Sequence, residues 1–236
     1  MSTLPIDPGE LDVAFFWNQA FAAADANWRR LPSGERARTI VDLLLKHKAR
    51  VVLDLGCAIG RLSMLIAAQG IEVYGLDASE KAIAFARAWA QDEQMPNVHF
   101  DVGLASNLLY PNETFDAVVA NAVLDHMPLS EAQKAVREIW AVLRPGGLLF
   151  ASFDGLGGKE EMPYHILEDG TRLYVRGMYR GLIWRYYPDE EIRALLSRFR
   201  LEDLHTESDG SRVAIAFKEA QVGEVPGTEG TAAHRL

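Results

Sequence analysis

The feature that most constrains the fold is the regular alternation of short apolar runs with amphipathic segments through the middle of the chain. "RVVLDLG" (50–56) is a continuous β-branched run, too short for a helix and typical of a strand covered on both faces. "RLSMLIAAQG" (61–70) follows with apolar residues at helical spacing, and Gly70 is placed to end that helix. Such alternation, repeated as far as residue 153, predicts a parallel sheet with right-handed crossovers and helices on both faces.

The remaining elements of this region follow the same order. We expect strands at 71–77, 97–102, 114–121 and 148–153, and helices at 79–94 and 130–143. Ser130 and Gln133 match a capping box, and the proline and glycines of 144–147 are placed to end the helix before them.

The segments on either side of this region differ in character. Residues 1–49 look helical and predict an N-terminal helical cap, with Ser33 as an N-cap. Residues 154–187 predict an inserted antiparallel β element, with a hairpin at 169–170 and a further strand in "GLIWRYY" (181–187).

The last part of the chain returns to the alternation and completes the sheet. "PDEEIRALLSRF" (188–199) predicts a helix with Pro188 in its first position, and 200–208 and 212–220 predict two strands joined at 209–210. The fold class is therefore α/β, a doubly wound, mainly parallel seven-stranded sheet with helices on both faces. The predicted domain organisation is a helical cap (1–49), a cofactor-binding core (50–153), an inserted β element that covers the substrate (154–187), completion of the core (188–219) and a disordered tail (220–236).

Charge and cysteine content narrow the class of partner. The formal net charge of −9 makes nucleic acid an unlikely partner. The single cysteine excludes an internal disulfide and a cysteine-based zinc cluster, and the histidines have no metal-ligand spacing, so no metal is expected. No apolar run approaches the roughly 20 residues of a bilayer span. The sequence "MSTLPIDPGELD" lacks the basic and apolar regions of a signal peptide, so we expect a cytoplasmic protein without a membrane partner.

The loop between the first strand and its helix predicts a ligand site. "GCAIG" (56–60) lies where unpaired N–H groups at a helix N-terminus face the carboxyl edge of a sheet. It lacks the GK[ST] ending of a P-loop and the third glycine of a dinucleotide fingerprint. Asp77 ends the next strand, where a carboxylate can accept both hydroxyls of a ribose. These residues favour a nucleoside without phosphates, and we expect Ala58 to keep a negative φ.

Four segments, in order, resemble the class I S-adenosylmethionine-dependent methyltransferases. They are "VVLDLGCAIG" (51–60), "VYGLDAS" (73–79), the region 100–127 and "AVLRPGGLLF" (141–150). The resemblance covers about residues 50–153. It implies that the chain binds S-adenosyl-L-methionine as its cofactor and transfers the methyl group.

The resemblance also implies cofactor-binding residues. Carried over position by position, they are Asp54, Gly56, Cys57, Ala58, Gly60, Asp77, Ala78, Leu104, Ala105 and Asn121. In similar proteins the N-terminal helices often close over the cofactor, which adds Trp17, with core packing as the alternative. Many members have an aspartate where Leu104 stands, and that aspartate accepts a hydrogen bond from the adenine amino group. Leu104 cannot accept one. Another acceptor such as Asp101, or water, would then bind the amino group, or packing and backbone alone would hold the adenine.

The acceptor of the methyl group decides whether a base is needed. An alcohol or phenol must lose a proton, a neutral amine must present its lone pair, and a thioether needs neither. His126 in "NAVLDHMP" (121–128), with Asp125 beside it, is the candidate catalytic base. A structural role for His126 in the wall of the pocket is the alternative.

The inserted element supplies the candidates for acceptor binding. Aromatic walls can surround a cationic or thioether group, and an arginine can bind a carboxylate. The candidate substrate-binding residues are Tyr164, Arg176, Arg180, Trp184 and Tyr186. In the alternative, the aromatic residues pack on the sheet and the arginines face solvent or the second subunit of a homodimer.

The sequence therefore predicts methyl transfer to a small polar molecule through a nitrogen, oxygen or sulfur acceptor. Two alternatives stay open. One is methylation of a macromolecule such as tRNA or protein, although "NAVL" (121–124) stands where amino-directed base methyltransferases have N/D-P-P-Y. The other is a catalytically inactive, nucleoside-binding regulatory protein.

Overall fold

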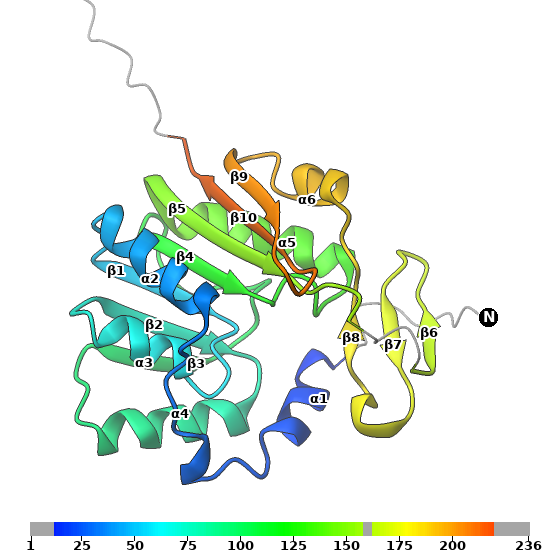
Figure 1. The fold of residues 1–236 in the computed structure, drawn as a ribbon, viewed down its shortest axis with the longest axis horizontal. Helices are drawn as coiled ribbons and strands as arrows, with labels where there is room; N and C mark the ends of the chain where they lie inside the picture. Colours follow the sequence, from blue (N-terminus) through cyan, green and yellow to red (C-terminus); the bar gives the residue numbers. More distant parts are fainter. Residues whose placement is uncertain (1–11, 158–161, 220–236) are drawn as a thin grey trace, which may run out of the picture.

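The computed structural model describes residues 12–157 and 162–219 and contains the predicted seven-stranded sheet (Figure 1). The strand order is β3-β2-β1-β4-β5-β10-β9. The first five of these strands are parallel, and β10 is antiparallel to both β5 and β9. The strands are β1 (Val51–Leu55), β2 (Glu72–Asp77), β3 (Val98–Val102), β4 (Phe115–Asn121), β5 (Leu143–Phe153), β9 (Arg200–Thr206) and β10 (Arg212–Phe217). The predicted fold class is confirmed.

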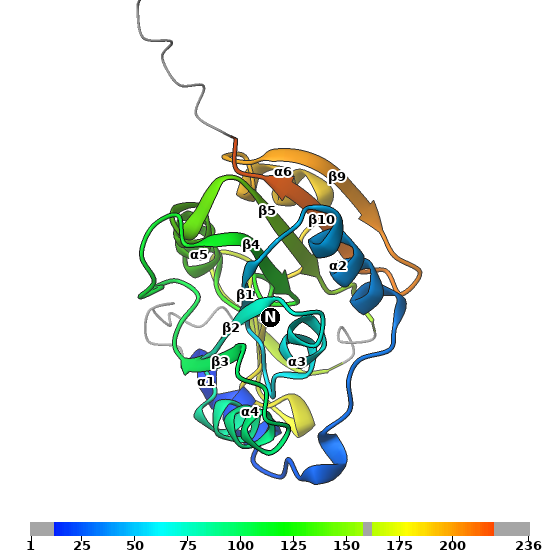
Figure 2. The same ribbon diagram turned by 90° about the vertical axis from the view of Figure 1, so that its left-hand side faces the viewer.

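Helices cover both faces of this sheet. They are α1 (Val13–Ala20), α2 (Glu35–Lys46), α3 (Arg61–Ala67), α4 (Glu80–Asp92), α5 (Leu129–Val142) and α6 (Asp189–Leu195), with short 3-10 helices at Ala26–Trp28 and Gly177–Tyr179. α2, α3 and α4 contribute to one hydrophobic cluster, and α5 and α6 contribute to the other. Figure 2 shows α5 on the opposite side of the sheet from α2 and α3.

The continuous apolar runs of the sequence are explained by these two clusters. Val52 packs under α2–α4, whereas its neighbour Leu53 packs under α5 and α6, and both side chains are 0% exposed. In β4, Val119 likewise packs under α2–α4, and Val118 packs under α5 and α6. Because successive side chains of a strand point to opposite faces, a strand buried on both faces is apolar throughout.

The inserted element forms a separate antiparallel sheet of β6 (Tyr164–Ile166), β7 (Arg172–Tyr174) and β8 (Ile183–Trp184). The hairpin predicted at 169–170 joins β6 to β7, and Gly170 has a φ of +85°. The strand predicted over 181–187 is shorter than expected. The Arg185 N–H donates to the Asp125 carbonyl at 2.8 Å, and this contact with the main domain takes the chain out of the small sheet.

The predicted capping box of Ser130 and Gln133 is wrong. α5 begins earlier, at Leu129, with Pro128 as its N-cap and no capping hydrogen bond from a side chain at that position. Asp169, in the β6–β7 hairpin, accepts the Leu129 N–H at 2.7 Å instead. A tertiary contact therefore provides the acceptor for a free N–H group at the N-terminus of this helix. The local sequence could not indicate this contact.

Three other boundaries are shifted. α2 has Gly34 rather than Ser33 as its N-cap, and Pro188 is the N-cap of α6 rather than its first helical residue. Both N-caps have extended ψ values, of 164° and 162°, which place them outside the helix. β5 begins at Leu143, before the proline and glycines, because this residue already pairs with Phe115 of β4.

The predicted disordered tail (220–236) and the first residues of the helical cap lie outside the described residues. No helix within the described ranges combines the length and apolar content that a membrane crossing requires.

Candidate functional site

A cavity of about 790 Å³ opens at the carboxyl edge of β1, β2 and β4. Loops after β1, β2, β3 and β4 form its floor, and residues of α1 and of the segment before α2 form its cover. Most of the predicted cofactor-binding residues line it: Trp17, Asp54, Gly56, Cys57, Ala58, Asp77, Ala78, Leu104, Ala105 and Asn121. Open parallel sheets bind ligands at this edge, because the strand ends present unpaired backbone groups there.

The glycine loop is held against the neighbouring strand. The N–H groups of Gly56 and Cys57 both donate to the Leu76 carbonyl, at 2.7 and 3.1 Å. Gly56 has a φ of +68°, and a Cβ on it would lie 2.4 Å from Cγ2 of Val123. Gly60 caps α3 with a φ of +82° and lies against Phe100 rather than lining the cavity. Glycine is required at both positions by conformation and by close packing.

Ala58 does not keep the negative φ that we expected. Its φ is +50°, and its N–H donates to Oδ2 of Asp77 at 2.8 Å. This hydrogen bond offsets the cost of the left-handed conformation, which is about 1–2 kcal/mol for a residue with a Cβ. The backbone of the first loop is therefore set by a carboxylate from the second strand.

Asp77 is placed to receive a ribose. Its second oxygen accepts the Ser79 N–H at 2.8 Å, so each carboxylate oxygen holds one backbone donor and keeps capacity for another. Burial raises the pKa of Asp77, and the hydrogen bonds from Ser79 and Ala58 oppose that shift. The residues present therefore fit a nucleoside whose two hydroxyls bind Asp77.

Asp54 gives the cavity a second buried acid. Its carboxylate is 2% exposed and accepts the Ser63 hydroxyl at 2.5 Å. Burial raises the pKa of Asp54 to about 7, the Ser63 hydrogen bond opposes this shift, and the nearby charge of Asp77 adds to it. A cation in the cavity would favour the ionised form of Asp54. The site therefore suits a positively charged nucleoside such as S-adenosylmethionine, with its sulfonium and ammonium groups.

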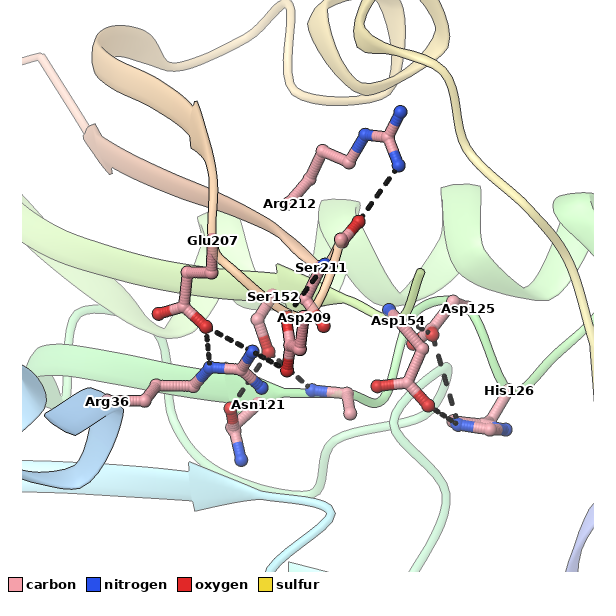
Figure 3. A network of polar contacts seen from close by, with 12 residues as sticks. Arg36, Asn121, Asp125, His126, Ser152, Asp154, Glu207, Asp209, Ser211 and Arg212 are labelled. Atoms are coloured by element: carbon pink, nitrogen blue, oxygen red, sulfur yellow. Dashed lines mark hydrogen bonds and ion pairs between the residues drawn. The ribbon is translucent and has the colours of Figure 1, made fainter. Parts of the chain in front are cut away.

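Asn121 lies at the end of β4 in a fixed orientation. Its Oδ1 accepts the Ser152 hydroxyl at 2.8 Å, and the Ser152 oxygen accepts the Ala122 N–H at 2.9 Å. The amide nitrogen of Asn121 therefore points away from Ser152 (Figure 3). Cys57, in the floor nearby, is buried, and this burial raises the pKa of its thiol well above the ordinary value. The thiol is thus a packing group rather than a nucleophile.

His126 lines the cavity, and its two ring nitrogens have different neighbours. Nδ1 lies 3.2 Å from the Ile183 carbonyl, which can only accept, so Nδ1 carries a hydrogen. Nε2 lies 3.5 Å from Oδ2 of Asp154 and 3.8 Å from Oδ2 of Asp125 (Figure 3). The His126 ring also meets the Trp17 ring edge-on, with 5.2 Å between centroids.

Asp125 lies behind His126 and does not line the cavity. It is 0% exposed, and its Oδ2 accepts the Asp154 N–H at 2.8 Å. Burial raises the pKa of Asp125, the charge of His126 opposes the shift and the charge of Asp154 adds to it. Asp125, His126 and Asp154 offer ligand atoms within 4.8 Å of one another, so they are the described residues that could share a cation. The expectation of no metal stays a prediction.

The predicted substrate-binding residues of the inserted element do not line the cavity: Tyr164, Arg176, Arg180, Trp184 and Tyr186. Trp184 is 0% exposed and packs with Tyr174 under α1. The Arg212 guanidinium donates to the Tyr186 hydroxyl, and Arg176 and Arg180 are exposed. These positions correspond to the packing alternative, and an acceptor-binding role for these residues gains no support from their location.

Several residues of the cavity gave no recognised signal in the sequence. Arg36, at the start of α2, lines it and pairs with Glu207 and Asp209 in the β9–β10 hairpin (Figure 3). These partners are more than 170 positions away, so no local pattern could link them. Phe21, Ser106, Glu131 and Lys134 also line the cavity. Gly103 could have been found from the sequence, since it directly follows the predicted strand 97–102. In the structure a Cβ on it would lie 2.9 Å from Leu76.

The fold and site together define a Rossmann-like protein that binds a cationic nucleoside at the carboxyl edge of its sheet. Residues 52–147 match the family model of a methyltransferase domain. The chain is 28% identical to a ubiquinone biosynthesis O-methyltransferase from Coxiella burnetii over 174 residues, 70% of this chain and 73% of that protein. It is 32% identical to the uncharacterized methyltransferase YcgJ from Bacillus subtilis over 96 residues, 41% of this chain and 37% of that protein.

Solved structures give the same answer for the fold. The PH0226 protein from Pyrococcus horikoshii superposes with a TM-score of 0.66 and 26% identity, covering 79% of this chain and 93% of that one. A 1,6-didemethyltoxoflavin-N1-methyltransferase from Burkholderia thailandensis, with bound S-adenosylhomocysteine, has a TM-score of 0.67 and 24% identity, covering 93% of both chains. Residues 52–147 thus form a methyltransferase domain, and the chain has the class I fold of the S-adenosylmethionine-dependent methyltransferases.

Proposed function

We propose that the chain methylates a small polar molecule at a hydroxyl group that must lose its proton. The observation that carries this proposal is the covered end of the cavity, where Trp17 of α1 stands over His126. The cavity volume of about 790 Å³ lies within the range of small-molecule sites, about 300–1,000 Å³. A base beside a covered pocket favours a small acceptor over tRNA or a protein side chain.

His126 is suited to take the proton from such an acceptor. The hydrogen on Nδ1 is held by the Ile183 carbonyl, so Nε2 is the basic nitrogen of the neutral ring. The carboxylates of Asp125 and Asp154 near Nε2 stabilise the imidazolium that proton transfer produces. Together they would make His126 the base and Asp125 a positioning residue behind it.

The other residues of the cavity would align the reactants and exclude water. S-adenosylmethionine supplies an activated methyl group on its sulfonium. The loop at Gly56 and the side chain of Asn121 would fix the donor end of the cavity. Trp17, Phe21 and Met127 add apolar wall at the covered end, which keeps water from the acceptor. The name of the Coxiella burnetii relative, an O-methyltransferase, supports an oxygen acceptor.

The test uses labelled S-adenosylmethionine with the full chain and a cell extract separated into small-molecule, RNA and protein fractions. Label in the small-molecule fraction is expected. His126→Ala should lower the turnover rate about 100-fold or more, because general base catalysis contributes that much. The affinity for S-adenosylhomocysteine should stay within about twofold, because His126 belongs to the acceptor end of the cavity.

A matched control is His205→Ala, which removes an exposed histidine paired with Asp203 on β9. This variant should keep the wild-type turnover rate. Label confined to RNA or protein would refute the proposal of a small-molecule acceptor. Full turnover by His126→Ala would refute the proposal that His126 is the general base. An absence of label in every fraction would favour the regulatory alternative.

A further inference from the structure

The adenine of the cofactor has a definite place in the cavity. The carboxyl ends of β1, β2 and β3 lie side by side, because these strands are neighbours in the sheet. The glycine loop (56–60) after β1 receives the methionine part, and Asp77 at the end of β2 receives the ribose. The adenine therefore falls beside the next loop, 103–106, which lines the cavity after β3.

The 6-amino group of adenine donates two hydrogens and needs an acceptor when it is buried. Leu104 stands at the family's usual acceptor position and cannot accept. Asp101, the substitute considered from the sequence, does not line the cavity, and its carboxylate pairs with Arg87 and Tyr110 at 3.3 and 3.5 Å. A side-chain acceptor would therefore come from another residue near the loop.

Two cavity-lining side chains near this loop can accept a hydrogen bond. They are Ser106, within the loop, and Glu131, in the first turn of α5. The other side-chain acceptors among the described lining residues lie elsewhere: Asp54 is bonded to Ser63, Asp77 to the glycine loop and Asn121 to Ser152 at the end of β4, and His126 lies against Trp17 at the covered end.

Glu131 is held as a charged acceptor. Its Oε1 accepts from Nζ of Lys134 at 2.7 Å, and the Ser106 side chain lies near enough to help lower its pKa. Burial opposes ionisation of Glu131, but Lys134 and Ser106 outweigh it and lower the pKa. A second carboxylate of α5, Glu138, accepts the Leu108 N–H at 2.9 Å. The chain after β3 is thus tied to α5 at two points, and Figure 2 shows the two lying side by side.

We propose that Glu131, together with Ser106, accepts the hydrogen bond from the adenine 6-amino group and so gives the cofactor site its selectivity for adenine. The Glu131 carboxylate from α5 then takes the role of the aspartate that many family members have at the position of Leu104. Ser106 can donate its hydroxyl hydrogen to Glu131 and accept from the amino group at the same time. The proposal rests on the cofactor of the family and is independent of the methyl acceptor.

The test is calorimetry of the full chain with S-adenosylhomocysteine and with its analogue that has hydrogen in place of the 6-amino group. The wild-type chain should prefer S-adenosylhomocysteine about tenfold or more, because a hydrogen bond to a charged acceptor contributes about that factor. Glu131→Ala should abolish this preference by weakening S-adenosylhomocysteine and leaving the analogue nearly unchanged. Ser106→Ala should reduce the preference in part.

The control variant is Lys134→Met, which removes the partner of Glu131 and leaves its carboxylate in place. It should keep most of the preference. Thermal unfolding and circular dichroism establish that each variant is folded. An unchanged preference in folded Glu131→Ala overturns the proposal, and so does an equal loss of affinity for both ligands. Failure of the wild-type chain to bind either ligand would instead contradict the cofactor assignment.

Discussion

The two ends of the cavity are built from contacts of very different sequence separation. At the cofactor end, the hydrogen bond from Ala58 to Asp77 spans 19 positions, and the loops belong to neighbouring strands of one sheet. At the acceptor end, the contact of His126 with Ile183 spans 57 positions, and that of Arg36 with Glu207 spans 171. The first end follows from strand order alone, whereas the second requires α1, the small sheet and the β9–β10 hairpin to pack around it.

Substitutions at the two ends of the cavity should therefore have different effects. A change at the cofactor end should affect binding of S-adenosylhomocysteine and, through it, every turnover. A change at the acceptor end should affect methyl transfer and leave the binding of S-adenosylhomocysteine intact. Three experiments at the cofactor end sharpen this distinction.

The largest effect is expected at Asp77. Asp77→Ala removes the predicted acceptor of both ribose hydroxyls and the partner of the Ala58 N–H, so the Kd of S-adenosylhomocysteine should rise about 100-fold or more. Asp77→Asn keeps the shape of the side chain, and its Kd for S-adenosylhomocysteine should rise less. Calorimetry measures both values. Asp203→Ala, an exposed aspartate on β9, is the control and should bind normally. Near-wild-type affinity in folded Asp77→Ala would remove Asp77 from the site.

A smaller effect, on stability, is expected at Gly56. Gly56→Ala places a methyl 2.4 Å from Val123 at a positive φ, and it should lower the free energy of unfolding by about 2–3 kcal/mol. Urea unfolding measures the loss. The control is Gly34→Ala, since a Cβ there meets nothing within 4 Å and its φ is −67°. Equal stability of Gly56→Ala and the wild type would mean that the loop is not held as described.

The smallest effect is the uptake or release of a proton. Burial raises the pKa of Asp54 to about 7, and a bound cation favours the ionised carboxylate. Binding of S-adenosylmethionine should therefore release a proton, about half a proton at pH 7, more at pH 6 and almost none at pH 8.5. Calorimetry in buffers of different ionisation enthalpy measures this number. Asp54→Asn should abolish the release, whereas His126→Asn should not. The opposite result would place the proton-linked group at the acceptor end.

The raised pKa of Asp54 also makes the stability of the fold depend on pH. Without the cation, folded Asp54 holds its proton up to about pH 7, whereas an unfolded aspartate loses it near its ordinary value, about pH 4. The folded state therefore binds more protons between these values, and its stability falls as the pH rises through that window. A bound cation reverses this loss by favouring the charged form.

The sheet and the cofactor end could be predicted from the sequence because their signals are local. The run of 50–56, the glycines of the loop and Asp77 each report on the segment in which they lie. Strand alternation then brings the ends of β1 and β2 together through the right-handed crossover rule. The positive φ of Ala58 was missed, because it depends on the hydrogen bond that its N–H donates to Asp77 of the next strand.

The acceptor end could not be predicted in the same way. Aromatic and arginine residues of 164–187 suggested a binding surface, yet Trp184 is buried under α1 and Arg176 faces solvent. The same residue types serve packing and recognition, so composition cannot separate the two roles. Glu131 was likewise invisible, since an acidic residue in the first turn of a helix is ordinary on its own.

The sequence by itself thus predicted the α/β class, the succession of strands and helices along the chain and, through the resemblance of four segments to a known family, the methyl donor, because these depend on periodicity and on residues within short segments. Only the tertiary structure decided which side chains meet in the cavity. Arg36 and Glu131 line it, and Asp154 lies beside His126, through packing of helices and hairpins far apart in the chain. Such packing arises from the burial of many apolar side chains together, and no short stretch of sequence records it.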